Sequence, residues 1–383
     1  MKEADCRLEA VSAPDGLKVV LMLRADAERV VAGPTEQARR YGSYLEEQGA
    51  SVTLWADASP PPGRYDVGHL FNLDWPVETA WHYKLARRCC DRVVLSTIHH
   101  REQWMEGLHH AARRGLAGLV GSRLPLQVFE GLRGAWLAGT RPSLWPEGAR
   151  QLLGVRRRQT GLLAEVDMML VLATGEQASL RDEFGTDGPS AFVPNGASAS
   201  DGELPRGLPD EFLLCVGRIE MRKNQLMLLD AAARLDLPVV LAGPVNTHHR
   251  ALGRELRRRT EESSGVIWLG GLDWSSALNL YRRALCHVLP SWCEVVPLVD
   301  LEAARAGCRV VTTARGYTSE YLGDRAGYWD PATGVSGLAS QISVQLSAAA
   351  PPAHGQPDLT WERAGEALVE AYRRVLESPA TSA

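Results

Sequence analysis

The sequence lacks the features that would place it in several special classes of protein. No apolar run in its 383 residues approaches the roughly 18 that a membrane-spanning helix needs, and the first residues show no apolar core of a secretory signal. Basic residues are not in excess, because 42 lysines and arginines stand against 46 aspartates and glutamates, a formal net charge of -4. That balance argues against nucleic-acid binding through bulk positive charge. We expect a cytoplasmic protein, and its length suggests two domains.

Cysteine and lysine are also sparse. The seven cysteines are scattered, and no two of them form a C-x-x-C pair, so the sequence indicates neither a disulfide framework nor a zinc site. Only four of the 42 basic residues are lysines. Each lysine therefore carries more weight than usual, and Lys223 falls in a segment discussed below.

Short apolar runs alternate with amphipathic segments along the chain. Strand-like runs occupy 18–23, 51–55, 66–71, 92–98 and 166–173, then 212–217, 238–243, 266–271, 286–290 and 309–313. Helical patterns occupy 35–49, 224–235, 248–262, 275–284, 297–306 and 359–376. Continuous apolar runs, rather than alternating ones, predict parallel sheets buried on both faces.

The Gly-, Pro-, Ser- and Asp-rich stretch 194–210 separates the two series and predicts a linker. We therefore predict an α/β protein with two Rossmann-like, doubly wound domains that face a cleft. The domains are 1–200 and 201–358, and a C-terminal helix lies in 359–383, for which packing back on the N-terminal domain is one arrangement. In such sheets ligands bind at the carboxyl ends of the strands.

The segment 291–308, SWCEVVPLVDLEAARAGC, holds two carboxylates, Glu294 and Glu302. Pro297 suits the first position of a helix that Gly307 would end. Glu302 would then lie in the second turn among apolar neighbours, where a carboxylate needs donors such as the vicinal hydroxyls of a ribose. The helix start offers N–H groups and a positive dipole end to a phosphate. The pair alone decides nothing, since a solvated helix residue and an ordinary loop acid fit equally well.

Arg218 and Lys223 flank a turn directly after the strand 212–217, at the same sheet edge as the loop before the 297 helix. Two cations there suit a diphosphate, the arginine through a planar fork and the lysine as a point charge. A solvated basic turn is the alternative. Residues 101–158 are rich in arginine, and that face predicts either contact with anionic lipid or, more simply, a solvated helix surface.

Together these segments resemble the donor-binding domain of glycosyltransferase family 4, the group 1 retaining enzymes of the GT-B fold. VGRIEMRKNQ (216–225) is similar to the family's G-R-x-x-x-x-K-[NG] signature, and SWCEVVPLVDLEAARAGCRVV (291–311) is similar to its E-x7-E signature. VPNGAS (193–198) and GYTSEYLGDRAGYW (316–329) match two further stretches in the expected order. The resemblance covers about residues 190–335 well and the N-terminal half loosely.

The resemblance implies roles at the matching positions. Arg218 and Lys223 would bind the donor diphosphate, Glu302 the ribose and Glu294 hydroxyls of the donor sugar. Backbone at Val296 and Leu298 would contact sugar and phosphate, and backbone at Gly271 or Leu272 the base. His99 matches a histidine that contacts the donor sugar near the reacting carbon, and Gly33 a first loop that borders the cleft. The implied catalytic set is His99, Glu294, Arg218 and Lys223.

The chain departs from the family pattern after Glu294. Members commonly show E-G-F-G-L-P, whereas this chain reads Glu294-Val295-Val296-Pro297-Leu298-Val299. Fewer glycines restrict the approach of a ligand to the backbone, and Pro297 removes one amide donor. The donor sugar is therefore left open.

The function implied by the resemblance is retaining transfer of a sugar from a nucleotide-diphosphate sugar to a hydroxyl of a glycan, lipid-linked saccharide or small glycoside. Neither a cofactor nor a metal is expected, which agrees with the lack of any D-x-D triplet. The partners would be the nucleotide sugar and a carbohydrate acceptor, without nucleic acid. Contact with the inner membrane face through 101–158 stays open. The alternatives are a nucleotide-sugar epimerase of the same fold and a non-catalytic partner protein.

Overall fold

The computed structural model describes residues 13–25, 27, 33–111, 154–198, 207–348 and 359–379, with the single positions 128, 131 and 147. The chain divides into two compact units. Unit 1 is Met1–His99, Pro125–Asn195 and Thr360–Ala383, and unit 2 is His100–Leu124 and Gly196–Leu359. The division after Asn195 lies close to the expected boundary at 200, but the segment 100–124 was expected in the N-terminal domain and belongs to unit 2.

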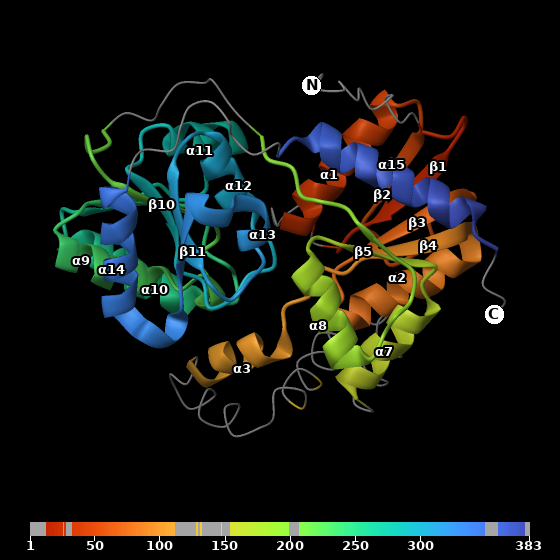
Figure 1. Ribbon diagram of the computed structural model, residues 1–383, viewed down its shortest axis with the longest axis horizontal. Helices are drawn as coiled ribbons and strands as arrows, with labels where there is room; N and C mark the ends of the chain where they lie inside the picture. The colour runs from red at the N-terminus through yellow and green to blue at the C-terminus, as the bar shows by residue number, and fades with distance from the viewer. Residues whose placement is uncertain are drawn as a thin grey trace, which may run out of the picture. The chain divides into compact units, whose positions relative to one another are not determined.

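Unit 1 is built on a six-stranded parallel sheet of order β2-β1-β3-β4-β5-β6. Its strands are β1 (Lys18–Met22), β2 (Ser51–Trp55), β3 (Tyr65–Phe71), β4 (Cys90–Ser96), β5 (Met168–Val171) and β6 (Ser190–Phe192). Its helices are α1 (Gly33–Glu47), α2 (Pro76–Cys89), α7 (Val155–Glu165), α8 (Thr174–Phe184) and α15 (Trp361–Glu377). Figure 1 shows α1 and α15 on one side of the sheet and α2, α7 and α8 on the other.

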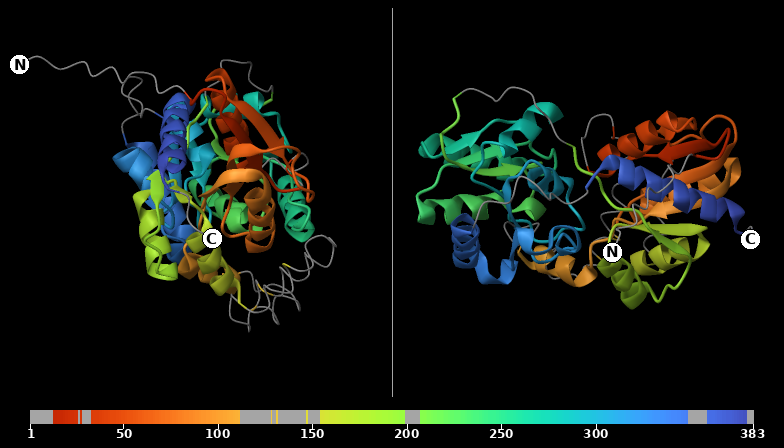
Figure 2. Two further views of the ribbon diagram at one scale, coloured as in Figure 1. Left: turned by 90° about the vertical axis from the view of Figure 1, so that its right-hand side faces the viewer. Right: turned by 45° about the horizontal axis from the view of Figure 1, so that its top comes forward.

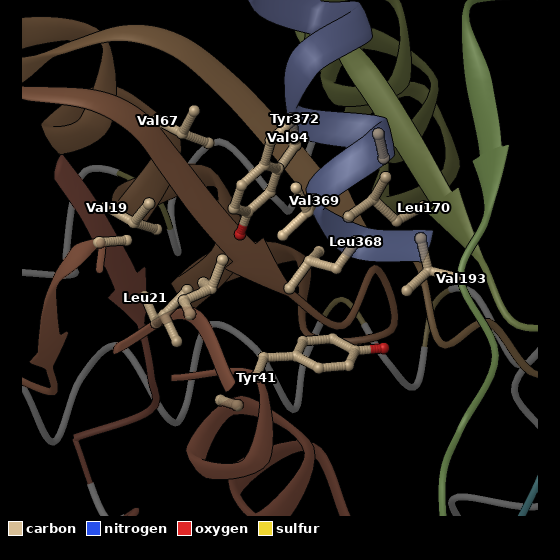
Figure 3. Close-up of a cluster of buried hydrophobic side chains, with 14 of the residues drawn as sticks. Val19, Leu21, Tyr41, Val67, Val94, Leu170, Val193, Leu368, Val369 and Tyr372 are labelled. Atoms are coloured by element: carbon tan, nitrogen blue, oxygen red, sulfur yellow. The ribbon is translucent and has the colours of Figure 1, made fainter. Parts of the chain in front are cut away.

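Both faces of this sheet are buried, as the continuous apolar runs predicted. Along β1, Val19 and Leu21 join the core under α1 and α15, whereas Val20 and Met22 join the core under α2, α7 and α8. Successive side chains of a strand point to opposite faces, so a strand covered on both sides is apolar at every position. Figure 3 shows the first of these cores, to which α15 contributes Leu368, Val369 and Tyr372.

The C-terminal helix α15 is part of unit 1, and Figures 1 and 2 both show it beside α1. A buried polar contact fixes it to the sheet. His69 of β3 makes hydrogen bonds of 2.8 Å with the Tyr372 hydroxyl through Nδ1 and with Ser96 Oγ through Nε2. Burial lowers the pKa of His69 to about 3, so the ring is neutral in the folded protein.

Unit 2 holds a second six-stranded parallel sheet, of order β12-β11-β10-β7-β8-β9. Its strands are β7 (Leu213–Val216), β8 (Val239–Ala242), β9 (Val266–Trp268), β10 (Cys286–Leu289), β11 (Arg309–Thr313) and β12 (Ala326–Trp329). Its longer helices are α3 (Glu102–Ala111), α9 (Gln225–Leu235), α10 (Arg250–Glu262), α11 (Trp274–Tyr281), α12 (Leu298–Arg305) and α14 (Gly334–Ser347). Its short turns are η2 (Met221–Lys223), α13 (Ser319–Leu322), η3 (Gly323–Arg325) and η4 (Pro331–Thr333).

The helices of unit 2 also flank their sheet. Figure 1 shows α9, α10 and α14 on one side and α11, α12 and α13 on the other. Read from β9 to β12, the strands run third, second, first, fourth, fifth and sixth in chain order, which is the order typical of a dinucleotide-binding Rossmann fold. The prediction of two doubly wound α/β halves is therefore confirmed for each unit taken by itself.

Candidate functional site

The candidate site lies where the strand order of unit 2 reverses. β7 and β10 are hydrogen-bonded neighbours, yet the chain continues from them to opposite sides of the sheet. Loops that leave two such strands diverge, and ligands of open α/β sheets bind at that position. One loop carries Arg218 and Lys223, and the other carries Glu294. The fold thus brings together the two segments that the sequence singled out.

Five charged side chains form a continuous series of ion pairs between these loops, in the order Arg218, Glu220, Arg222, Glu294, Lys223. Arg218 lies 3.3 Å from Glu220, whose other oxygen lies 3.1 Å from Arg222. Arg222 also lies 2.5 Å from Glu294 Oε2, and Lys223 Nζ lies 2.8 Å from Glu294 Oε1. Three cations thus alternate with two anions, and the cluster keeps one net positive charge.

Glu294 pairs with two of the cations and is 5% exposed. Burial alone would raise the pKa of its carboxyl, but the charges of Arg222 and Lys223 outweigh burial. Hydrogen bonds from Lys223 and from Ser291 Oγ (2.6 Å) add to this effect, and the pKa of Glu294 falls well below its usual value. The carboxylate is therefore ionised at neutral pH and can only accept hydrogen bonds.

The loop that carries Glu294 is held by the loop after β11. The Glu294 amide donates to the Arg315 carbonyl at 2.9 Å, and the Tyr317 amide donates to the Val295 carbonyl at 2.9 Å. Gly316 lies between these bonds, where a Cβ would come within 2.9 Å of the Glu294 carbonyl oxygen. Only glycine allows so close an approach, so the backbone around Glu294 is fixed on two sides.

The helix α12 starts one residue later than predicted. Pro297 is its N-cap rather than its first helical residue, and no side chain caps the N-terminus. Gly307, with φ of 78°, follows the helix and confirms the expected stop. Glu302 is 6% exposed in the second turn, as expected, and its charge helps to raise the pKa of Tyr281, although burial is the larger cause.

The remaining positions of unit 2 lie at the same edge of the sheet. Val296 is buried and Leu298 is partly exposed. Gly271 and Leu272 follow β9, and Gly271 is exposed. The turn before them is joined to β8, because the Gly243 amide donates to the Gly270 carbonyl at 2.6 Å.

His99 of unit 1 follows β4 and is held between two carboxylates. Its Nδ1 lies 2.5 Å from Asp74 Oδ1, and its Nε2 lies 2.8 Å from Glu183 Oε2. Burial would lower the pKa of His99, but the charge of Asp74 and the hydrogen bonds to both carboxylates raise it to about 10. The ring is thus an imidazolium at neutral pH, and both of its nitrogens already have partners.

A third carboxylate fixes the backbone at His99. Glu176 is fully buried at the start of α8. One of its oxygens accepts hydrogen bonds from the His99 amide at 2.8 Å and the Thr97 hydroxyl at 2.7 Å, and its second oxygen accepts one from the Leu172 amide at 2.7 Å.

Gly33 is the first residue of α1 rather than part of an open loop, and a Cβ there would contact nothing within 4 Å.

Few of the residues that bear on lipid contact through 101–158 are described in the structure. Of the arginines expected on a lipid-facing surface, Arg156 donates to the Glu183 carbonyl and Arg158 pairs with Glu147. Most of the stretch 101–158 lies outside the described residues. Among the residues that are described, no helix is long and apolar enough to cross a membrane, and no three His, Cys, Asp or Glu residues are grouped so that they could hold a metal ion.

Sequence reasoning missed the partners of these residues. Arg222 occupies an unspecified position of the G-R-x-x-x-x-K pattern, and the Glu294 to which it binds lies far along the chain. The alternation Arg218, Glu220, Arg222 is a weak signal of a charge network. Asp74 was noted only as one of the residues after the third strand, and Glu183 was not noted, because only the fold brings them to His99.

Known proteins are similar to this chain in sequence or in fold. The chain is 27% identical over 253 residues to glycogen synthase from Mycobacterium tuberculosis, covering 61% of this chain and 60% of that protein. It is 25% identical over 379 residues to D-inositol 3-phosphate glycosyltransferase from Mycolicibacterium paratuberculosis, covering 92% and 77%. Among solved structures, an Anabaena protein determined with UDP and glucose aligns at a TM-score of 0.57 with 14% identity, covering 94% and 95%.

Two six-stranded Rossmann-like units and this likeness define the class of the protein, which is an α/β protein of the GT-B fold. Residues 199–346 match the family described as glycosyl transferases group 1. The chain spans about three fifths of the length of the glycogen synthase that it matches.

Proposed function

We propose that the protein is a retaining glycosyltransferase that moves a sugar from a nucleotide-diphosphate sugar to a hydroxyl of a carbohydrate acceptor. The observation that carries this proposal is the cluster of Arg218, Lys223 and Glu294 at the strand reversal of a group 1 glycosyl transferase domain. The likeness to a protein solved with UDP and glucose supports it.

In the proposed reaction, Arg218 and Lys223 bind the diphosphate and stabilise the charge that develops on it as it leaves. The acceptor oxygen forms a bond to the anomeric carbon on the face from which the phosphate oxygen departs. The hydroxyl proton passes to that departing oxygen, so the products are the glycoside and the nucleoside diphosphate. These two cations take the part that a metal ion plays in other enzymes, and the proposal includes no cofactor.

The other residues have assigned roles in the same proposal. Glu302 binds the ribose hydroxyls, Glu294 binds a hydroxyl of the donor sugar, and the start of α12 faces the phosphate. The loop after β9 contacts the base through its backbone. His99 contributes as a fixed positive charge rather than as a proton carrier, because both of its ring nitrogens are paired.

A thermal-shift titration with UDP, ADP, GDP and their glucose conjugates tests the binding step. A ligand that binds the folded state raises the melting temperature. Lys223→Ala and Glu302→Ala should each lower the affinity for the tightest-binding nucleotide about 10- to 100-fold. Each removes a charged hydrogen bond worth roughly 1.5–3 kcal/mol. Lys18→Ala, which changes an exposed lysine of unit 1, is the matched control and should leave the affinity unchanged. Equal affinity in the parent and both site variants would reject the assignment.

Product analysis then separates the alternatives. With an α-linked donor and saccharide acceptors, NMR of the product should show an α-linkage. Conversion of the sugar nucleotide without an acceptor would indicate an epimerase. A protein whose melting temperature responds to none of the nucleotides would be a non-catalytic member of the fold.

A further inference from the structure

Arg222 is the only residue of the charge cluster that binds both of its carboxylates, within the part of the chain that the structure describes. Its guanidinium lies 3.1 Å from Glu220 and 2.5 Å from Glu294. The other two cations each pair with one carboxylate, Arg218 with Glu220 and Lys223 with Glu294. Arg222 therefore joins two ion pairs into one network.

Arg222 also binds the backbone of the loop after β10. Its Nη1 donates to the Cys293 carbonyl at 2.9 Å, and its own carbonyl accepts the Trp292 amide at 2.8 Å. A single residue of the turn η2 thus contacts three consecutive residues of the opposite loop, of which Glu294 is the last. Such bonds from both main chain and side chain fix the position of the loop as well as its charge.

Because this network is buried, Arg222 is needed to keep its two carboxylates ionised. Glu294 is 5% exposed and Glu220 is also 5% exposed, and a buried carboxylate without enough positive charge becomes protonated instead of staying ionised. Removing Arg222 would leave two carboxylates with Arg218 and Lys223 only, one cation each. Lysine and arginine are not equivalent here, because only the planar fork can serve two carboxylates and a carbonyl at once.

The donors around Glu294 define what the carboxylate can still bind. Oε1 receives Lys223 and Ser291, and Oε2 receives Arg222. A carboxylate accepts about four hydrogen bonds in all. Among the described residues, one acceptor position of Oε2 therefore remains unfilled, enough for one hydroxyl of a ligand without breaking any existing contact.

We propose that Arg222 is a positioning residue that keeps the Glu294 carboxylate ionised and oriented, with one acceptor position left for a donor-sugar hydroxyl. This role deepens the proposed function and rests on it for the identity of the ligand. It does not depend on ligand binding for its first test, because the charge state of Glu294 is a property of the protein alone.

The first test follows the titration of Glu294 by NMR of protein labelled with 13C at the glutamate carboxyl, with Glu294→Gln identifying the signal. In the parent protein the Glu294 signal should not titrate down to the lowest pH at which the chain stays folded. In Arg222→Gln its midpoint should rise by at least one pH unit, and Arg222→Lys should restore part of that change. Arg259→Gln, which removes an arginine of α10 paired with Asp230 of α9, is the matched control and should behave as the parent.

The second test measures the affinity for the best sugar nucleotide against pH. In Arg222→Gln, the pH below which affinity is lost should rise by the same amount as the midpoint of the Glu294 titration. The variant should also lose more affinity for the sugar nucleotide than for the free nucleoside diphosphate. An unchanged Glu294 titration in the folded Arg222→Gln protein would overturn the role of Arg222. If that titration shifts but no nucleotide binds to any variant, the inference about Arg222 stands and the proposed function fails.

Discussion

At the scale of single residues, this protein keeps several charges inside its folded units by pairing each with an opposite charge. His99 is 4% exposed between Asp74 and Glu183, and Glu294 is buried between two cations. A lone buried charge would shift its pKa and become neutral, so the partners decide the protonation state. The chemistry of each site therefore depends on residues that the functional motif does not include.

The His99 triad predicts a pH dependence of stability. The pKa of His99 is raised from about 6.5 in the unfolded chain to about 10 in the folded one. Below pH 6.5 the ring is charged in both states and the stabilisation is fully present. Between pH 6.5 and 10 only the folded state keeps the proton, so the free energy of unfolding should fall, by on the order of 2–4 kcal/mol.

Urea unfolding of the parent and of His99→Gln across this pH range measures the effect. Glutamine can bond to both carboxylates but does not titrate, so its free energy of unfolding should decline less over the same range. A ring-nitrogen NMR titration of the parent protein gives an independent check on the pKa. Parallel declines in the two proteins, or a ring that loses its proton near pH 6.5, would contradict the prediction.

At the scale of elements, the helix α12 is held by a buried pair. His287 of β10 and Asp300 of α12 are both fully buried, with Nε2 and Oδ1 3.2 Å apart, and the Tyr281 ring lies edge-on to His287 at 5.3 Å. The carboxylate lies in the first turn of the helix, where the dipole favours a negative charge. The pair therefore fixes the helix that carries Glu302 to the strand that leads to Glu294.

Breaking this pair on one side should be costly. His287→Leu leaves Asp300 buried without its partner, and we expect a loss of about 3–5 kcal/mol in the free energy of unfolding, measured by chemical denaturation. The double variant with Asp300→Leu should be more stable than His287→Leu alone, because two apolar side chains leave no polar side chain buried at this position. A single variant as stable as the parent, or a double variant less stable than the single one, would show that the pair does not hold the helix.

The elements show what the sequence could and could not predict. The strands were recognisable because runs such as 19–23 are apolar at every position, as a strand covered on both faces requires. The helices α2 and α8 and the short strand β6 were not predicted from the sequence. The cations of the site were visible from their motif, whereas Arg222 was not, because its function comes from Glu294, a carboxylate far along the chain.

At the scale of the whole molecule, the two units differ in how the chain builds them. The strands of unit 2 all lie between Leu213 and Trp329, so its sheet comes from one continuous segment. Unit 1 needs both ends of the chain, because α15 covers one face of a sheet that is complete by Phe192. Leu368, Val369 and Tyr372 are each fully buried in that face.

This difference predicts the behaviour of fragments. The fragment 196–359 should fold by itself and keep the nucleotide affinity of the parent within about tenfold, because it contains the whole charge cluster and α12. It lacks α3, whose Met105 contacts Cys293 beside the cluster, and this loss accounts for the expected decrease. The fragment 1–195 should not fold alone, since removing α15 exposes the apolar face that Leu368 and its neighbours cover, and such a face favours aggregation.

Addition of the peptide 360–383 to the fragment 1–195 provides the decisive measurement. Its helix should restore a cooperative unfolding transition, because the covered face and the hydrogen bond from His69 to Tyr372 are regained together. The variant peptide with Tyr372→Ala should restore it poorly, since it removes both the aromatic packing and that bond. A fragment 1–195 that unfolds cooperatively without any peptide would show that the sheet of unit 1 is stable with one face uncovered, and the division of the chain into these two units would then not describe how it folds.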